Sequence, residues 1–133
     1  MITLVPLDDL FTIYQVSDFK SVPSEIYNAG FFSVTSTGDE ISVVTNCKTI
    51  FPELKANEGW KCFRVEGILD FSLVGIINEI TRPLKDSKIS VFVISTFNTD
   101  YLFVKEESFL RAIEILKMTD NIKVEAQNLS AVD

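Results

Sequence analysis

The sequence contains no histidine and only two cysteines among its 133 residues. Without an imidazole, the chain cannot form a Ser-His-Asp or Cys-His catalytic arrangement, a histidine general base or a histidine metal site. Cys47 and Cys62 lie far apart and outside any CxxC spacing. They could form one disulfide, but a chain with this apolar content can build a core without one, so a reducing cytosolic setting is expected.

Basic residues are also scarce, with 12 Lys and Arg against 19 Asp and Glu and a formal net charge of −7. No stretch clusters the Lys and Arg side chains that a phosphate backbone or an anionic membrane requires, so neither is an expected partner. The start of the chain lacks the basic leader of a signal peptide, and no apolar run approaches the ~20 residues of a membrane span. We therefore expect a cytoplasmic protein.

Catalytic and cofactor motifs are absent as well. The sequence has no P-loop, no GxGxxG and no metal-ligand spacing. Carboxylates that could support acid–base chemistry do not recur in a motif near one another. These observations predict a protein that is not an enzyme and that uses no cofactor and no metal.

Hydrophobic residues make up 47% of the chain and charged residues 23%, which predicts a globular fold. The turn containing Gly38, where a positive φ would cost little, predicts a hairpin. The nearly all-apolar run at 88–95 predicts a central strand buried on both faces. Alternation or short apolar runs predict strands at residues 11–16, 31–36, 40–46, 60–67, 88–95, 100–105 and 122–126.

Apolar residues at three- and four-residue spacing predict two helices, within residues 70–87 and 106–120. Asp70 or Ser72 could cap the first helix, and Pro83 is expected to end it because proline removes a backbone donor. The two apolar stripes comprise Leu73, Ile76, Ile77, Ile80 and Leu84, then Phe109, Leu110, Ile113, Leu116 and Lys117. Before residue 60 only short helices are predicted, near 23–28 and 48–54.

The second half of the chain therefore has the order βαββαβ, an α+β arrangement of the ferredoxin-like kind. Shifting the chain by 60 residues places 31–44 on 91–104 with similar apolar alternation, which suggests an internal repeat. We predict two related subdomains that pack together, an N-terminal one at residues 1–59 with short helices and a C-terminal one at 60–133. Residues 55–60 would form the junction.

Two segments carry a family resemblance: EGILDFSLVGIINEI at 66–80 and ISTFNTDYLFVKEE at 94–107. Together they resemble the ACT domain, and in particular stand-alone ACT proteins related to a cytosolic arginine sensor and to the regulatory domain of aspartate kinase. The resemblance covers residues 60–118 well and the first half loosely. It implies a ferredoxin-like ACT fold, a regulatory role in binding amino acids, and side-by-side association into a homodimer.

The resemblance also implies where a ligand would bind. A helix N-terminus offers backbone N–H groups to the carboxylate of an amino acid, and a carboxylate with turn carbonyls could hold its ammonium group. The residues that border the effector pocket in the family correspond here to Asp70, Phe71 and Gly75 on one side and Thr96, Phe97, Asn98, Thr99 and Asp100 on the other.

Each residue of this site also has a plainer explanation. Asp100 could simply terminate a turn, Gly75 could let the helix lie close to the sheet, and Phe97 could be a hydrophobic plug. Asp70 could cap the helix, a role compatible with an anion site.

Leu73 and Val74 stand where the family often has polar residues, which favours a neutral or apolar ligand over arginine. Three further carboxylates are expected to lie on solvated surface: Glu25, Glu53 and Glu58.

The expected function is that of an allosteric sensor that binds a free amino acid or similar metabolite at a subdomain or dimer seam. Ligand binding would favour one packing arrangement and so inform a regulated protein partner. The alternative is a protein–protein interaction module that keeps the same fold without a ligand.

Overall fold

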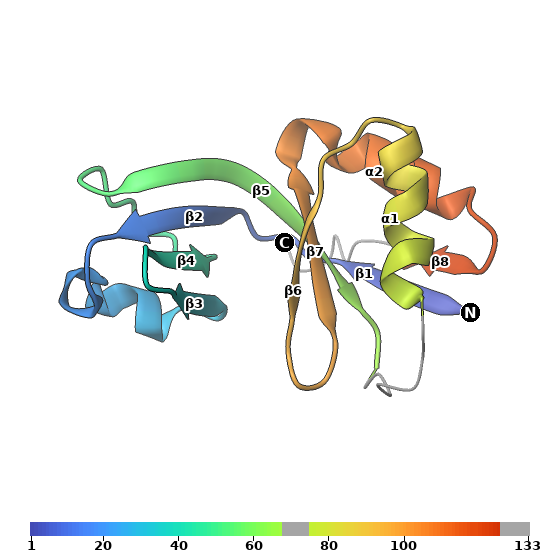
Figure 1. Cartoon of the computed structure of the whole chain (residues 1–133). Coiled ribbons are helices and arrows are strands. Elements are labelled where there is room, and N and C mark those ends of the chain that lie inside the picture. The colour runs from blue at the N-terminus through green and yellow to red at the C-terminus, as the bar shows by residue number, and fades with distance from the viewer. Residues whose placement is uncertain (68–74, 126–133) are drawn as a thin grey trace. The chain divides into compact units, whose positions relative to one another are not determined.

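The computed structural model describes residues 1–67 and 75–125 (Figure 1). These residues form two compact units, here called the inserted unit, Asp9–Trp60, and the outer unit, Met1–Asp8 with the described residues from Lys61 onward. The α+β prediction is confirmed. The first eight residues belong with the C-terminal part of the chain, whereas the sequence-based division places them in the N-terminal subdomain.

The outer unit contains the βαββαβ order, with one additional strand. Its strand order is β8-β1-β5-β7-β6. β1 pairs antiparallel with β5 and parallel with β8, so it lies between the first and last strands of the βαββαβ motif. These strands are β1 (Ile2–Pro6), residues 61–65 of β5 (Lys55–Val65), β6 (Phe92–Ser95), β7 (Asp100–Lys105) and β8 (Ile122–Val124). β1 was not predicted from the sequence.

Helices α1 (Ile76–Asp86) and α2 (Phe109–Lys117) lie next to one another on this unit, and the short helix η3 (Glu106–Ser108) leads into α2 (Figure 1). Their buried faces complete a core of aliphatic and aromatic side chains. Fully buried members of this core are Leu4, Phe63, Ile80, Leu84, Leu102, Val104, Ala112 and Leu116.

Two details of the predicted helices were wrong. α1 continues three residues past Pro83, because Leu84 is fully buried and the N–H of Ser87 closes the last turn onto the carbonyl oxygens of Pro83 and Leu84. Packing of this turn outweighs the hydrogen bond that proline removes. In α2, Leu110 is 71% exposed and Ala112 is buried in the core instead.

β6 is an edge strand among the described residues, and the prediction of a central strand buried on both faces was wrong. It pairs only with β7, and its side chains are half-buried or exposed. Its apolar character has a different origin. Phe92 stacks on Phe103 of β7 with ring centroids 4.5 Å apart, and Val93 packs against the outer unit's core.

The inserted unit has the strand order β3-β4-β2-β5, with antiparallel pairing throughout. Residues 55–60, predicted as a junction, form the part of β5 that pairs with β2. The elements are β2 (Phe11–Val16), η1 (Phe19–Ser21), η2 (Ser24–Asn28), β3 (Phe32–Ser36) and β4 (Ile41–Thr45). Its core gathers Tyr14, Val16, Val22, Ile26, Ile41, Val43 and Phe51.

The β3–β4 and β6–β7 hairpins close with the same four-residue turn. In one, the Thr37 N–H donates to the Glu40 carbonyl (2.9 Å) and the Glu40 N–H donates to Thr37 Oγ1 (3.1 Å). In the other, the Thr96 N–H donates to the Thr99 carbonyl (2.8 Å) and the Thr99 N–H to Thr96 Oγ1 (3.3 Å). Thr37 and Thr96 lie 59 residues apart in the sequence, so the structural repeat is 59 residues and not 60.

The burial pattern agrees with the 59-residue repeat. Val43 of β4 and Leu102 of β7 then occupy matching positions and both are fully buried. Val34 and Val93 also match, and each packs against the core of its own unit. Apolar alternation has a period of two and tolerates similar residues at many positions, so it could not fix the shift by itself.

Gly38 is not needed for backbone conformation in its turn. The described residues with positive φ are Gly59, Gly67, Gly75, Lys88 and Asn121, and Gly38 is not among them. The Thr37 hydroxyl closes the turn without a left-handed residue. This explains why Phe97 can stand at the matching position of the second hairpin.

Both cysteines are free, Cys47 half-exposed in the inserted unit and Cys62 buried in the outer unit. Burial raises the pKa of the Cys62 thiol well above its usual range, which keeps it protonated and unreactive.

Over the described ranges, no helix is both long and apolar enough to cross a bilayer.

Candidate functional site

The β6–β7 turn is fixed to the end of strand β5. Thr99 is only 8% exposed, and its Oγ1 donates a 2.7 Å hydrogen bond to the carbonyl oxygen of Val65, the last residue of β5. From Val65 the chain continues toward residues 70–75, the other segment expected at the site. The structure thus brings the turn to the end of the strand that precedes residues 70–75 in the sequence.

Asp100 lies at the start of β7, directly opposite Ser95 of β6. It is half-buried, and its Oδ1 accepts a 2.5 Å hydrogen bond from Ser95 Oγ. This bond links the two strands next to the turn, so Asp100 has the turn-stabilising role that the sequence left open. A carboxylate has two oxygens with several acceptor positions, and this one bond uses a single oxygen.

Phe97 and Asn98 form the exposed tip of the same turn. Phe97 is 88% exposed, so the interpretation of its ring as a hydrophobic plug was wrong. The ring lies at the position that Gly38 occupies in the other hairpin, where the turn leaves any side chain in solvent.

Gly75 forms the N-cap of α1 with φ +86° and ψ 2°, and its carbonyl accepts the first helical hydrogen bond from Glu79 N–H at 2.9 Å. A Cβ at this position would meet no atom of the described residues within 4 Å. Close packing of the helix on the sheet therefore does not explain the glycine. The left-handed backbone favours glycine here instead.

The remaining predicted site residues, Asp70 and Phe71, lie outside the described residues, as do Leu73 and Val74. The described part of the predicted site thus consists of Gly75 and the turn 96–100.

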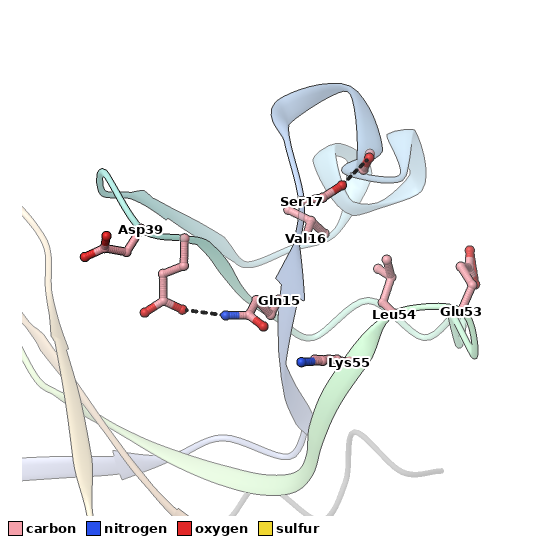
Figure 2. A pocket seen from close by; sticks show the side chains of 9 residues that line it. Gln15, Val16, Ser17, Asp39, Glu53, Leu54 and Lys55 are labelled. Carbon is pink, nitrogen blue, oxygen red and sulfur yellow. Dashed lines mark hydrogen bonds between the residues drawn. The ribbon is translucent and has the colours of Figure 1, made fainter.

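The inserted unit contains a pocket of about 550 Å³ that the sequence analysis did not predict. Figure 2 shows side chains from the end of β2, from η1, from the β3–β4 turn and from the start of β5 around it. Its lining residues are Gln15, Val16, Ser17, Ser21, Asp39, Glu40, Glu53, Leu54 and Lys55.

A row of polar residues crosses three strands beside this pocket. Gln15 of β2 is paired with Ser42 of β4 on one side and with Lys55 of β5 on the other. The carboxylate oxygen Oε1 of Glu40 accepts hydrogen bonds from Gln15 Nε2 (3.1 Å) and Ser42 Oγ (2.9 Å). A second, smaller pocket of about 240 Å³ shares Gln15, Glu40 and Lys55, so these three residues lie where the two hollows meet.

None of these pocket residues was expected to be functional, and Glu53 was interpreted as solvated surface. Glu53 is exposed, yet it lines the pocket. The internal repeat was the signal that could have found them, because the turn 37–40 corresponds to the predicted site turn 96–99.

Among the described residues, no group of three or more His, Cys, Asp or Glu side chains is arranged to hold a metal ion.

A family model described as the ACT domain matches residues 55–118. Residues 55–118 are therefore similar to an ACT domain. The match includes β5, both helices, β6 and β7, so it contains Gly75 and the 96–100 turn.

Sequence relatives include the protein named cytosolic arginine sensor for mTORC1 subunit 1. The Homo sapiens protein is 35% identical over 95 residues, which cover 65% of this chain and 29% of the relative. The Rattus norvegicus protein is 33% identical over 112 residues, which cover 73% of this chain and 34% of the relative. The chain therefore spans about a third of the length of these curated relatives.

Solved structures show the same fold. The Agobacterium tumefaciens protein Atu0741 is similar with a TM-score of 0.83 and 29% identity over 95% of both chains. Aspartate kinase from Synechocystis is similar with a TM-score of 0.67 and 13% identity, over 95% of this chain and 28% of the kinase. The kinase comparison supports the fold alone.

Proposed function

We propose that this chain is a regulatory protein that binds a free amino acid next to the β6–β7 turn, at the end of strand β5. The observation that carries the proposal is the buried hydrogen bond from Thr99 Oγ1 to the Val65 carbonyl. It fixes the turn that precedes Asp100 to the end of β5. The match of residues 55–118 to the ACT domain and the similarity to a protein named as an arginine sensor support an amino acid as the ligand.

In this proposal the ligand is held at its two charged groups. Gly75 has no side chain that could cap α1, and in this proposal the first N–H groups of the helix bind the ligand carboxylate, favoured by the helix dipole. The Asp100 carboxylate and the turn carbonyls receive the ammonium group. Gly75 itself has no side chain to block a ligand, and a Cβ there would meet no described atom within 4 Å.

Regulation follows if the ligand binds one arrangement of the protein more tightly than another. We propose a cytoplasmic homodimer as the regulated form, in which ligand occupancy changes packing and is sensed by a partner protein. The exposed edge of β6 is one surface on which a second chain could add.

A ligand-free protein–protein interaction module is the second candidate. The 88% exposed ring of Phe97 favours it, because an exposed aromatic at the tip of a rigid turn is a typical anchor for a partner surface.

A thermal-shift screen of the purified chain against the proteinogenic amino acids at millimolar concentration separates the two candidates. A ligand present at a hundredfold excess over its dissociation constant stabilises the fold by about 2.7 kcal/mol, which raises the melting temperature by several degrees. We expect a selective shift, and we expect Asp100→Asn to lose it. Asparagine still accepts the Ser95 hydrogen bond, so this variant removes the charge and keeps the fold.

The matched control is Asp120→Asn, which changes an exposed carboxylate outside the site and should keep the shift. If no amino acid changes the melting temperature of the wild-type chain, the sensor proposal is wrong and the interaction module takes its place.

A further inference from the structure

The pocket of the inserted unit occupies the place that corresponds, by the internal repeat, to the proposed site of the outer unit. The turn 37–40 matches the turn 96–99 through the same pattern of hydrogen bonds. In each unit the last residue of the turn contacts the end of a strand: Thr99 bonds to Val65 of β5, and Glu40 bonds to Gln15 of β2. The two sites thus share one backbone framework.

The size of the pocket is suitable for a small molecule. Its volume of about 550 Å³ lies within the range of roughly 300–1,000 Å³ that is usual for ligand sites. Val16 and Leu54 supply apolar surface, and the Ser17 and Ser21 hydroxyls, 3.3 Å apart, lie beside it (Figure 2).

The Glu40 carboxylate is held in place before any ligand arrives. Its Oε1 accepts from both Gln15 and Ser42, so two hydrogen bonds from two neighbouring strands orient it. A carboxylate oriented in this way can receive an ammonium group with little further loss of side-chain entropy.

Lys55 lies on the other side of Gln15 from Ser42. Neighbouring strands are roughly 5 Å apart, so the lysine and the Ser42 position are separated by roughly 10 Å across the sheet. Figure 2 shows the nitrogen ends of Gln15 and Lys55 directed to the same side. Over the described part of the chain Lys55 forms no salt bridge. The pocket therefore offers one negative and one positive group with Gln15 between them.

We propose that this pocket is a second ligand site, which binds a small molecule carrying both a primary ammonium group and a carboxylate. Glu40 receives the ammonium group and Lys55 the carboxylate. Three carboxylates line the pocket, those of Asp39, Glu40 and Glu53, against the single Lys55 ammonium, so ligands with a second carboxylate are disfavoured. The ligand class rests on the proposed function; the site itself rests on the cavity and the repeat.

Calorimetric titration of the full chain tests the proposal with three probes of different charge, L-leucine, L-lysine and L-aspartate. Two further probes, N-acetyl-L-leucine and L-leucinamide, lack the ammonium group and the carboxylate respectively. The titrations are made in the Asp100→Asn chain, so that binding at the proposed outer site is removed. We expect L-leucine and L-lysine to bind, and L-aspartate and N-acetyl-L-leucine not to bind.

Glu40→Gln and Lys55→Met are then added to this chain. Glutamine still accepts from Gln15 and Ser42, so Glu40→Gln changes the charge and keeps the local hydrogen bonds. Loss of a charge-assisted contact should weaken L-leucine binding by about tenfold to a hundredfold. Lys55→Met should weaken L-leucine more than L-leucinamide. Glu25→Gln, an exposed carboxylate of the same unit outside the pocket, is the matched control and should bind as the parent chain does.

The possible failures are distinguishable. If no probe binds the Asp100→Asn chain, or if Glu40→Gln and Lys55→Met both bind like the control, the second site does not exist. If Asp100→Asn leaves the wild-type binding unchanged and Glu40→Gln removes it, the outer site fails and the second site stands. Thermal melts of each variant confirm that it is folded before it is titrated.

Discussion

The turns Thr37–Glu40 and Thr96–Thr99 have the same backbone closure, but their last residues make different contacts. Glu40 extends its carboxylate across the strand ends to Gln15 and Ser42, at a pocket. Thr99 is buried and bonds to the backbone of Val65. The first and last residues of the turn therefore have different roles. The threonine hydroxyl at the first position maintains the backbone shape, and the residue at the last position determines which neighbouring group the turn contacts.

The residues at the tips of the two turns also differ, as glycine in one and phenylalanine in the other. Gly38 and Phe97 occupy matching positions, and neither position requires a left-handed backbone. The tip is therefore free to vary in side chain without a change in fold. A change at the last position of the turn, in contrast, alters a contact with the adjoining strand.

The largest expected effect on stability comes from Thr99→Val. Valine has a similar shape but cannot donate to the Val65 carbonyl, which would remain buried and unsatisfied. The free energy of unfolding should fall by about 1–3 kcal/mol, measured by urea denaturation. Thr99→Ser keeps the hydroxyl and should lose much less. Equal losses for the valine and serine variants would show that packing of the methyl group matters more than the hydrogen bond.

A smaller effect is expected when either turn loses its first hydroxyl. Thr37→Ala and Thr96→Ala each remove the acceptor for the N–H at the end of the turn. Because the two turns are alike, each substitution should cost about 0.5–1.5 kcal/mol of unfolding free energy. A large cost in one hairpin with none in the other, in the same denaturation experiment, would mean that the turns are not equivalent.

The smallest effect is a gain from Gly38→Ala. The backbone at residue 38 does not have the positive φ that favours glycine, and a Cβ there would meet nothing within 4 Å. Alanine reduces the freedom of the unfolded chain, so the unfolding free energy should rise by about 0.4–1 kcal/mol. Gly75→Ala is the contrasting control, since its φ of +86° makes alanine strained and the variant should be destabilised. Destabilisation by Gly38→Ala would contradict this account of the turn.

Local patterns predicted most of the elements of this fold. Alternation located β2 and the two hairpins, and the helical stripes located α1 and α2. The place of β1 was not predictable in this way, because its pairing with β5 and β8 joins residues far apart in the sequence. The edge position of β6 was missed for a related reason: an apolar run does not reveal how many neighbours a strand has.

The proposed outer site could be predicted in part from the sequence, and the pocket of the inserted unit could not. The sequence indicated Gly75 and the 96–100 turn, and the structure places that turn at the end of β5. The inserted-unit pocket was missed because its residues come from four segments, and each of them resembles ordinary surface when considered alone. Glu53 illustrates this: it is exposed and unremarkable until Leu54, Lys55 and the β3–β4 turn are seen around the same hollow.

The most direct test of the central claim is amide chemical-shift mapping of the wild-type chain by NMR, with each proteinogenic amino acid added in turn. The account predicts that a binding amino acid shifts the amide signals of residues 96–100 and Gly75. A ligand of the second site would additionally shift those of Gln15, Glu40 and Lys55. If no amino acid moves the signals of residues 96–100 and Gly75, the proposal that this chain senses amino acids at the β6–β7 turn is contradicted.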